Sequence, residues 1–172
     1  MDDETEGAPP PRPVSRLGLL AYAIAAVVVV LDQASKYWIL DVVHLRGPIP
    51  VLPFFQLSMV WNQGVSFGLL RAGSDEARWV LVGFAAVVVV ALALWSRRPA
   101  RTLTAVALGL VMGGAIGNNL IDRVRFGAVA DFLDFHGLYF PWVFNLADSA
   151  ISIGVVFLLI DSFVSPRTEP AT

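Results

Sequence analysis

The sequence predicts an all-α membrane protein with four transmembrane helices and a small extramembrane β element between the first two helices. Of the 172 residues, 56% are hydrophobic and only 15% are charged, whereas a typical soluble domain carries roughly 25% charged residues. Four segments are each long and apolar enough to cross a bilayer, which takes roughly 20 residues of helix. A proline-rich stretch separates the first segment from the second.

The four spans are predicted at about residues 17–40, 77–95, 102–121 and 141–163. Runs of β-branched residues such as VVVV would favour strands in water. In lipid, however, the backbone of an isolated segment must satisfy its own hydrogen bonds, so these runs are predicted to be helical. The first span has no cleavage site of the signal-peptide type after it, so we expect it to be a retained helix.

The β element is predicted at about residues 41–76, within one four-helix membrane domain that covers residues 16–164. Three prolines, Pro48, Pro50 and Pro53, interrupt any helix there, and the alternation in FFQLSMVW favours short strands. Aromatic side chains are enriched at headgroup level, so we expect the element to rest on the bilayer surface through its aromatic residues Phe54, Phe55, Trp61 and Phe67.

The basic residues of the short loops predict the orientation of the chain. The segment SRRPAR, between the second and third spans, has three arginines and no acid. It is therefore predicted to be cytoplasmic, together with a disordered tail at residues 1–15 and a second tail at residues 165–172. The β element then lies at the outer face.

Composition also excludes several kinds of function. A net charge of −2 gives no reason to expect nucleic-acid binding. The chain has no cysteine, which rules out thiol catalysis, disulfides and thiolate zinc sites. Only His44 and His136 offer imidazole ligands, and they lie far apart without an H-E-x-x-H pattern. We therefore expect neither a metal site nor a cofactor.

Two aspartates, Asp131 and Asp148, flank a short loop at the mouth of the fourth span. Carboxylates beside hydrocarbon are costly, so they suggest a functional site by default. Taken singly, Asp148 could be a helix N-cap and Asp131 a solvated loop acid. Together they can share one proton, because two like charges a few Å apart do not both ionise. Such a pair supplies both the base and the acid that peptide hydrolysis needs.

Further polar residues lie near the outer ends of the spans. Asp32 and Lys36 are one helical turn apart and can form an ion pair that anchors the helix end. In NQGVSF, Asn62 can hydrogen-bond a peptide backbone and Gly64 permits a turn, although a plain loop turn explains both. Arg71 is expected to guide lipid headgroups.

The third span combines a packing face with a polar end. Small residues recur every four positions, at Ala105, Gly109, Gly113 and Gly117, which lets neighbouring helices approach closely. A polar cluster follows them at the outer end of the span, and its arginine can hold a carboxylate or an acyl-ester oxygen; its members are Asn118, Asn119, Asp122 and Arg123.

Five motifs, in the order DQASK, NQGVSF, GGAIGNNLIDR, VADFLDF and FNLADSA, resemble those of the bacterial lipoprotein signal peptidases, also called signal peptidase II. The resemblance implies a four-helix membrane aspartic protease that removes the signal peptide from prolipoproteins, cutting before a diacylglyceryl-modified cysteine. The implied partners are that precursor and membrane lipid, and the implied location is the bacterial cytoplasmic (inner) membrane, with the active site at the outer face.

The resemblance also assigns residues. It implies that Asp131 and Asp148 form the catalytic dyad. It implies support or substrate-binding roles for a second set: Asp32, Lys36, Asn62, Gly64, Asn119, Asp122, Arg123 and Asn145, with Ser66 and Phe67 also matching the motif around Asn62.

The chain departs from the family pattern at one place. GGAIGNNLIDR is one residue longer than the family's G-G-A-x-G-N-x-x-D-R, so either Asn118 or Asn119 can be the functional asparagine. Spacing to Asp122 favours Asn119, and the extra residue is expected to rotate the glycine face relative to the polar cluster. The main rival hypothesis is a small proton-coupled carrier with a relay through Asp32, Asp122 and Asp148.

Overall fold

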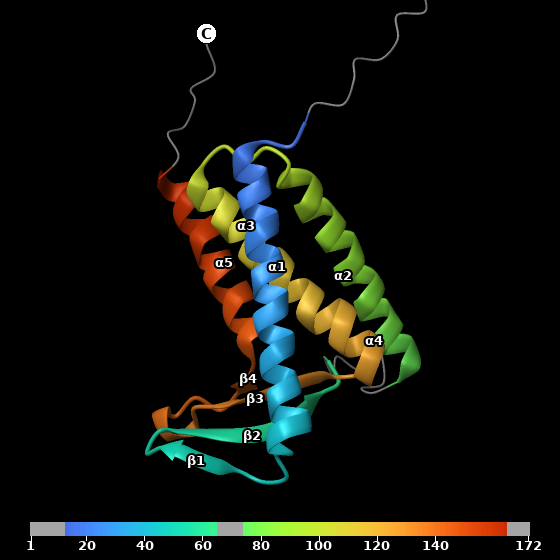
Figure 1. The fold of residues 1–172 in the computed structure, drawn as a ribbon, viewed down its shortest axis with the longest axis vertical. Coiled ribbons are helices and arrows are strands. Elements are labelled where there is room, and N and C mark those ends of the chain that lie inside the picture. The colour runs from blue at the N-terminus through green and yellow to red at the C-terminus, as the bar shows by residue number, and fades with distance from the viewer. Residues whose placement is uncertain (1–12, 65–73, 165–172) are drawn as a thin grey trace, which may run out of the picture.

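A computed structural model describes residues 13–64 and 74–164, which form a helical bundle with a sheet at one end (Figure 1). Four helical segments of 19 to 28 residues are long and apolar enough to cross a membrane. The helices are α1 (Arg16–Tyr37) with its π-helical extension η1 (Trp38–Val43), α2 (Asp75–Trp95), α3 (Thr102–Ala115) continued by the π-helical η2 (Ile116–Asp122) and α4 (Arg123–Phe126), and α5 (Leu146–Val164).

The sheet has four antiparallel strands in the order β1-β2-β3-β4. They are β1 (Ile49–Leu52), β2 (Phe55–Asn62), β3 (Val129–Asp134) and β4 (Val143–Phe144), and a short 3-10 helix η3 (His136–Leu138) lies between the last two. In the β2–β3 register Val60 pairs with Asp131 and Asn62 pairs with Val129. The end of β2 therefore lies beside the part of β3 that carries the first candidate aspartate.

The predicted fold class is confirmed, with three differences of detail. The first helix runs on to Val43, so the β element starts at Ile49 and not near residue 41. The sheet also takes two strands from the connection between the third and fourth spans, which was not predicted. Because Val143 and Phe144 pair with β3, the fourth helix begins at Leu146 and not near residue 141.

The aromatic residues predicted at the surface behave in different ways. Phe54 and Trp61 are exposed. Phe55 packs its ring against Phe135, with 4.6 Å between ring centroids. Phe67 lies outside the described residues.

The centre of the bundle is α3, which packs against α1 and α5. In its most apolar stretch, 61% of the residues are buried, against 11–22% in the other three spans. The small residues allow this packing. A Cβ added at Gly109 or Gly113 would lie 2.6 or 2.7 Å from a backbone oxygen of α1.

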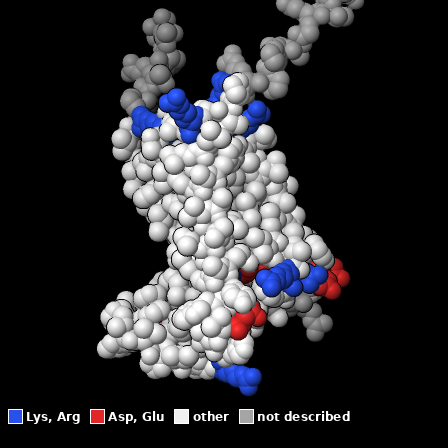
Figure 2. Space-filling view, in the orientation of Figure 1, with Lys and Arg blue, Asp and Glu red and all other residues white. Residues whose placement is uncertain are grey.

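The start of α1, the α2–α3 loop and the end of α5 all lie at the end of the bundle opposite the sheet (Figure 1). Backbone N–H of Ser15 donates to the Arg97 carbonyl at 2.9 Å, and the Arg98 guanidinium donates to the Pro13 carbonyl at 3.2 Å. Figure 2 shows Lys and Arg side chains gathered at this end. Near the sheet, the same view shows both basic and acidic side chains. The end opposite the sheet is therefore called the basic end, because its visible charged side chains are all Lys or Arg.

Close packing of α1 on α3 predicts that Gly113→Ala destabilises the protein, because the new Cβ would meet the Ala25 carbonyl at 2.7 Å. Overpacking of this kind typically costs about 1–3 kcal/mol, which should lower the melting temperature in detergent by several degrees. Gly83→Ala in α2 is the matched control, because nothing lies within 4 Å of its added Cβ. Equal melting temperatures for the two variants would contradict this account of the interface.

Candidate functional site

Asp131 and Asp148 meet where β3 passes the first turn of α5, and Asn145 hydrogen-bonds to both of them. The Asn145 side-chain amide donates to Asp131 Oδ1 at 2.7 Å, and its backbone N–H donates to Asp148 Oδ2 at 3.1 Å. In return, Asn145 Oδ1 accepts from the Asp148 backbone N–H at 2.9 Å. This reciprocal pair resembles a capping box, with Asn145 as the N-cap of α5 and Asp148 as its third residue.

Two further amides hold the same carboxylates. Asn118 donates to Asp148 Oδ1 at 2.7 Å, and Asn62 donates to Asp131 Oδ2 at 3.1 Å. Every oxygen of the two carboxylates thus accepts a hydrogen bond from an asparagine. These bonds orient the carboxylates without adding a charge to the site.

The surroundings of Asp131 favour its neutral form. Its exposed fraction is 2%, and it lies in the middle of β3. Asp131 is therefore not a solvated loop acid, which was the alternative interpretation of this residue. Burial, followed by the charge of Asp148, raises the pKa of Asp131 from its ordinary value of 3.8 to about 7. Near neutral pH this carboxyl therefore keeps a proton for much of the time.

Asp134, three residues further along β3, has the opposite environment. Gln56 donates to its Oδ2 at 2.7 Å, and the backbone N–H of His136 donates to its Oδ1 at 3.0 Å. These hydrogen bonds, with that from Gln56 the strongest influence, lower the pKa of Asp134 to about 2. Asp134 is therefore ionised near neutral pH, and its hydrogen bonds join β2, β3 and η3.

Behind the two aspartates lies a buried ion cluster centred on Lys36. Its ammonium group is 2.8 Å from Asp32 Oδ2 and 2.7 Å from Asp122 Oδ2, and the three side chains are 0–2% exposed. It also donates to Asn118 Oδ1 at 2.7 Å. The anchoring ion pair predicted for Asp32 and Lys36 is thus part of a larger network that joins α1 to η2.

Both acids of the ion cluster also bind backbone next to a candidate catalytic residue. Asp32 Oδ1 accepts from the N–H of Ala147 at 3.1 Å, and Ala147 immediately precedes Asp148. Asp122 Oδ2 accepts from the N–H of Ala130 at 3.2 Å, and Ala130 immediately precedes Asp131. The ion cluster therefore positions the backbone on both sides of the site.

Gln33 is a member of this cluster that sequence reasoning missed. Its side-chain amide donates to Asp122 Oδ1 at 2.9 Å and to Asp32 Oδ2 at 3.1 Å, so it bridges the two acids. The available signal was a polar residue at the end of an apolar span, inside the motif DQASK.

The structure differs from the prediction at the tandem asparagines. Asn118 contacts Asp148, Lys36 and Asn145, whereas Asn119 accepts a hydrogen bond from Arg123 Nε at 3.1 Å. The spacing argument for Asn119 assumed regular α-helix. The segment is the π-helix η2, whose wider turn takes up one extra residue.

The glycine face and the polar cluster stay aligned for the same reason. A Cβ added at Gly117, in η2, would lie 2.6 Å from Asp32 Oδ2. The packing face therefore continues to the ion cluster, and the expected rotation between the two is absorbed within η2.

Arg123 and Gly64 lie together at another side of the site. Arg123 is 6% exposed, and among the described residues its Nη1 has no hydrogen-bond partner. Gly64 has a left-handed φ of 101°, and a Cβ there would be 3.4 Å from Arg123 Nη1 and 2.7 Å from Leu81. The backbone N–H of Gly64 donates to Asn62 Oδ1 at 2.9 Å, which forms the predicted turn.

Some predicted features are not placed by the structure. Ser66, Phe67 and Arg71 lie outside the described residues, as do most residues of the two predicted tails. Within residues 13–64 and 74–164, no group of three or more His, Asp or Glu side chains is arranged to hold a metal ion.

Comparison with known proteins identifies close relatives. Residues 24–164 match the protein family described as signal peptidase (SPase) II. The chain is 57% identical to the lipoprotein signal peptidase of Caulobacter vibrioides, over 93% of this chain and 96% of that one. It is 50% identical to the lipoprotein signal peptidase of Rhizorhabdus wittichii, over 82% and 84% of the two chains.

The fold is also found in a solved bacterial membrane enzyme, determined by the in meso method at 1.9 Å resolution. The two structures match with a TM-score of 0.74 and 31% sequence identity, over 90% of this chain and 98% of the other.

The raised pKa of Asp131 predicts that Asp131→Asn stabilises the protein above neutral pH. The folded state holds this proton up to pH about 7 and the unfolded chain only up to about 4, so wild-type stability falls as pH rises through that window. The variant has no proton to lose. Its melting temperature should equal that of the wild type near pH 4 and exceed it at pH 8, by an amount equivalent to at most about 4 kcal/mol.

Thermal melting in detergent across pH 4–8 tests this prediction. Asp134→Asn is the control with the opposite sign, because the pKa of Asp134 is lowered and the ionised form stabilises the fold. A melting-temperature difference between wild type and Asp131→Asn that does not change with pH would contradict the assignment.

Proposed function

Because the chain belongs to the signal peptidase II family, we propose that it is an aspartic endopeptidase that removes the signal peptide from prolipoproteins, cutting before a diacylglyceryl-modified cysteine. The supporting observation is the shared contact of Asn145 with Asp131 and Asp148. It brings together two carboxylates, one of which has its pKa raised to about 7. Such a pair holds one proton between two carboxyl groups near neutral pH.

The proposed reaction is a direct attack of water on the peptide bond. The ionised carboxylate of the pair takes a proton from water, whose oxygen bonds to the carbonyl carbon, while the protonated carboxyl gives its proton to the carbonyl oxygen. The tetrahedral intermediate then collapses. The carboxyl that took the proton from water gives it to the leaving nitrogen as the C–N bond breaks, and the other carboxylate takes a hydroxyl proton from the intermediate, which restores the pair. The products are a peptide carboxylic acid, which ionises in water, and the free amine of the lipidated cysteine.

The ion cluster behind the pair acts as positioning machinery. Asp32 and Asp122 hold the backbone just before the two catalytic residues, and Lys36 binds both acids. Small displacements of catalytic groups are costly for rate. The carrier hypothesis would instead need Asp32 and Asp122 to pass protons along a relay. Both carboxylates, however, are buried and form ion pairs with the same Lys36 ammonium group.

Arg123 is proposed to bind the substrate backbone. A buried guanidinium N–H without a partner among the described residues is a costly arrangement. A carbonyl oxygen of the substrate would satisfy it. Gly64 has no side chain, which leaves room beside the Arg123 guanidinium. Asn62 holds the turn at Gly64 through its side-chain oxygen.

The enzyme is proposed to work in the bacterial inner membrane, with both termini in the cytoplasm and the active site at the outer face. The support for this orientation is the basic end of the bundle, which includes Arg97, Arg98 and Arg101 and lies opposite the sheet. Precursors anchored in the outer leaflet would then reach the pair directly from the lipid.

Removing either carboxylate is expected to abolish cleavage. Asp131→Asn and Asp148→Asn should each lower kcat by at least about 1000-fold, because the pair then lacks its base or its acid. The assay is mass spectrometry of a diacylglyceryl precursor peptide incubated with purified protein. Asp134→Asn, the same change on the same strand, should retain cleavage. Substantial turnover by either pair variant that still folds would refute the proposed mechanism.

The tandem asparagines give a second test. Asn118→Ala should lower kcat by about 100-fold, because it removes a hydrogen bond from Asp148 and one from Lys36. Asn119→Ala should leave kcat nearly unchanged and mainly raise KM, because Asn119 contacts Arg123. The reverse order of effects on kcat would show that Asn119 is the functional residue after all.

A further inference from the structure

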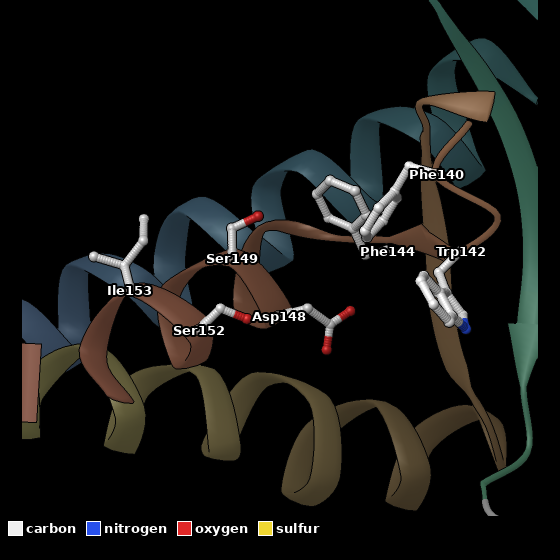
Figure 3. A pocket seen from close by; sticks show the side chains of 7 residues that line it. All are labelled: Phe140, Trp142, Phe144, Asp148, Ser149, Ser152 and Ile153. Atoms are coloured by element: carbon white, nitrogen blue, oxygen red, sulfur yellow. The ribbon is translucent and has the colours of Figure 1, made fainter. Parts of the chain in front are cut away.

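Two apolar pockets at one side of the site share a wall, because Phe140 and Phe144 line both of them. The first has a volume of about 330 Å³ and is bounded by Phe140, Phe144 and Trp142 on one side and by the first two turns of α5 on the other (Figure 3). The second, of about 340 Å³, is bounded by Phe140 and Phe144 again, together with Phe135 and Leu138. Asp148 lines the first pocket.

The shared wall is an aromatic group held by its own ring contacts. Phe140 meets Phe144 edge to face, with 5.7 Å between centroids. Phe135 stacks on Phe144 at 5.6 Å, and Trp142 contacts Phe140 at 5.2 Å. Aromatic pairs in these geometries are favourable, so the ring contacts stabilise the wall between the pockets.

The first pocket faces the hydrocarbon region. Ser152 and Ile153 of α5 line it, and Ile153 is 47% exposed. The apolar surface of α5 continues deeper into the membrane through Val156 and Ile160, which are also exposed. An occupant of this pocket therefore enters from the lipid and is itself apolar.

We propose that the two pockets receive the two acyl chains of one diacylglyceryl group, one chain on each side of the Phe140–Phe144 wall. The inference rests on the proposed function, which supplies a substrate with a forked apolar group beside the bond to be cut. A ligand with two chains from one glycerol fits two pockets divided by one wall. The glycerol would then lie at the edge of the wall, close to Asp148.

The pockets should act on rate more than on affinity. An acyl chain that leaves the bilayer for an apolar pocket gains no hydrophobic energy, because lipid is equally apolar. What the pockets add is orientation, which places the scissile bond against the catalytic pair. The expected effect of filling a pocket is therefore a lower kcat for the substrate that needs both pockets.

The test uses the full-length protein in micelles and two precursor peptides of identical sequence, one diacylated and one with a single acyl chain on the glycerol. Wild type should cleave the diacylated peptide about tenfold faster, a discrimination that apolar pockets can supply. Ser152→Leu fills the first pocket and should abolish this preference by slowing only the diacylated peptide. Val87→Trp, at an exposed position of α2 that lines neither pocket, should change neither rate.

A second variant removes bulk, so that the test does not depend on tolerance of a larger side chain. Ile153→Ala widens the first pocket and should raise the rate for methyl-branched chains relative to straight chains at least about threefold. Equal slowing of both peptides by Ser152→Leu would show that the pocket holds peptide and would overturn the inference. The inference would also be overturned if Ser152→Leu kept the preference for the diacylated peptide and Ile153→Ala did not change the rate for branched chains relative to straight chains. Failure of wild type to cleave either peptide would instead refute the proposed function.

Discussion

One buried ion cluster sets the geometry on which the site depends. Lys36 lies between Asp32 and Asp122 with almost no exposure to solvent. Breaking a buried ion pair by removing one partner typically costs about 3–5 kcal/mol, because an uncompensated charge remains. The two acids therefore stay bound to Lys36, and each also accepts a hydrogen bond from the backbone N–H just before one of the two proposed catalytic aspartates. Helix α1, the η2 turn, β3 and α5 are thereby locked into one arrangement.

The environment, and not the residue type, decides what each acid of β3 does. Asp131 is buried near another carboxylate, and its pKa rises to about 7. Asp134 accepts hydrogen bonds from Gln56 and His136, and its pKa falls to about 2. The same strand thus carries a carboxyl suited to proton transfer and one that only joins strands. The burial that would suit Asp131 to the proposed catalysis also lowers stability at high pH, because the folded protein holds this carboxyl more favourably in its neutral form.

The short π-helix η2 reconciles two demands on the third span. Above it, Gly109 and Gly113 must face the backbone of α1. Within η2, Asn118 must face Asp148 and Asp122 must face Lys36. The wider turn accommodates the additional residue of GGAIGNNLIDR while both faces stay in contact with their partners. The two proposed acyl pockets would add a similar constraint on the substrate, because the aromatic residues that line them would orient the bond to be cut.

The amino-acid sequence alone predicted the four spans, the pairing of Asp131 with Asp148 and the partnership of Asp32 with Lys36. Those features depend on the length of apolar runs, on the cost of charge beside lipid and on helical spacing, all of which are local. It did not predict β3 and β4, the contacts of Asn118 with Asp148 and Lys36, the bridging role of Gln33 or the paired aromatic pockets. Those depend on strand pairing and on side-chain contacts between distant segments, such as Gln33 and Asp122, which are 89 residues apart in the sequence. Only the tertiary structure decides such contacts, because no local pattern specifies which distant backbone a side chain will meet.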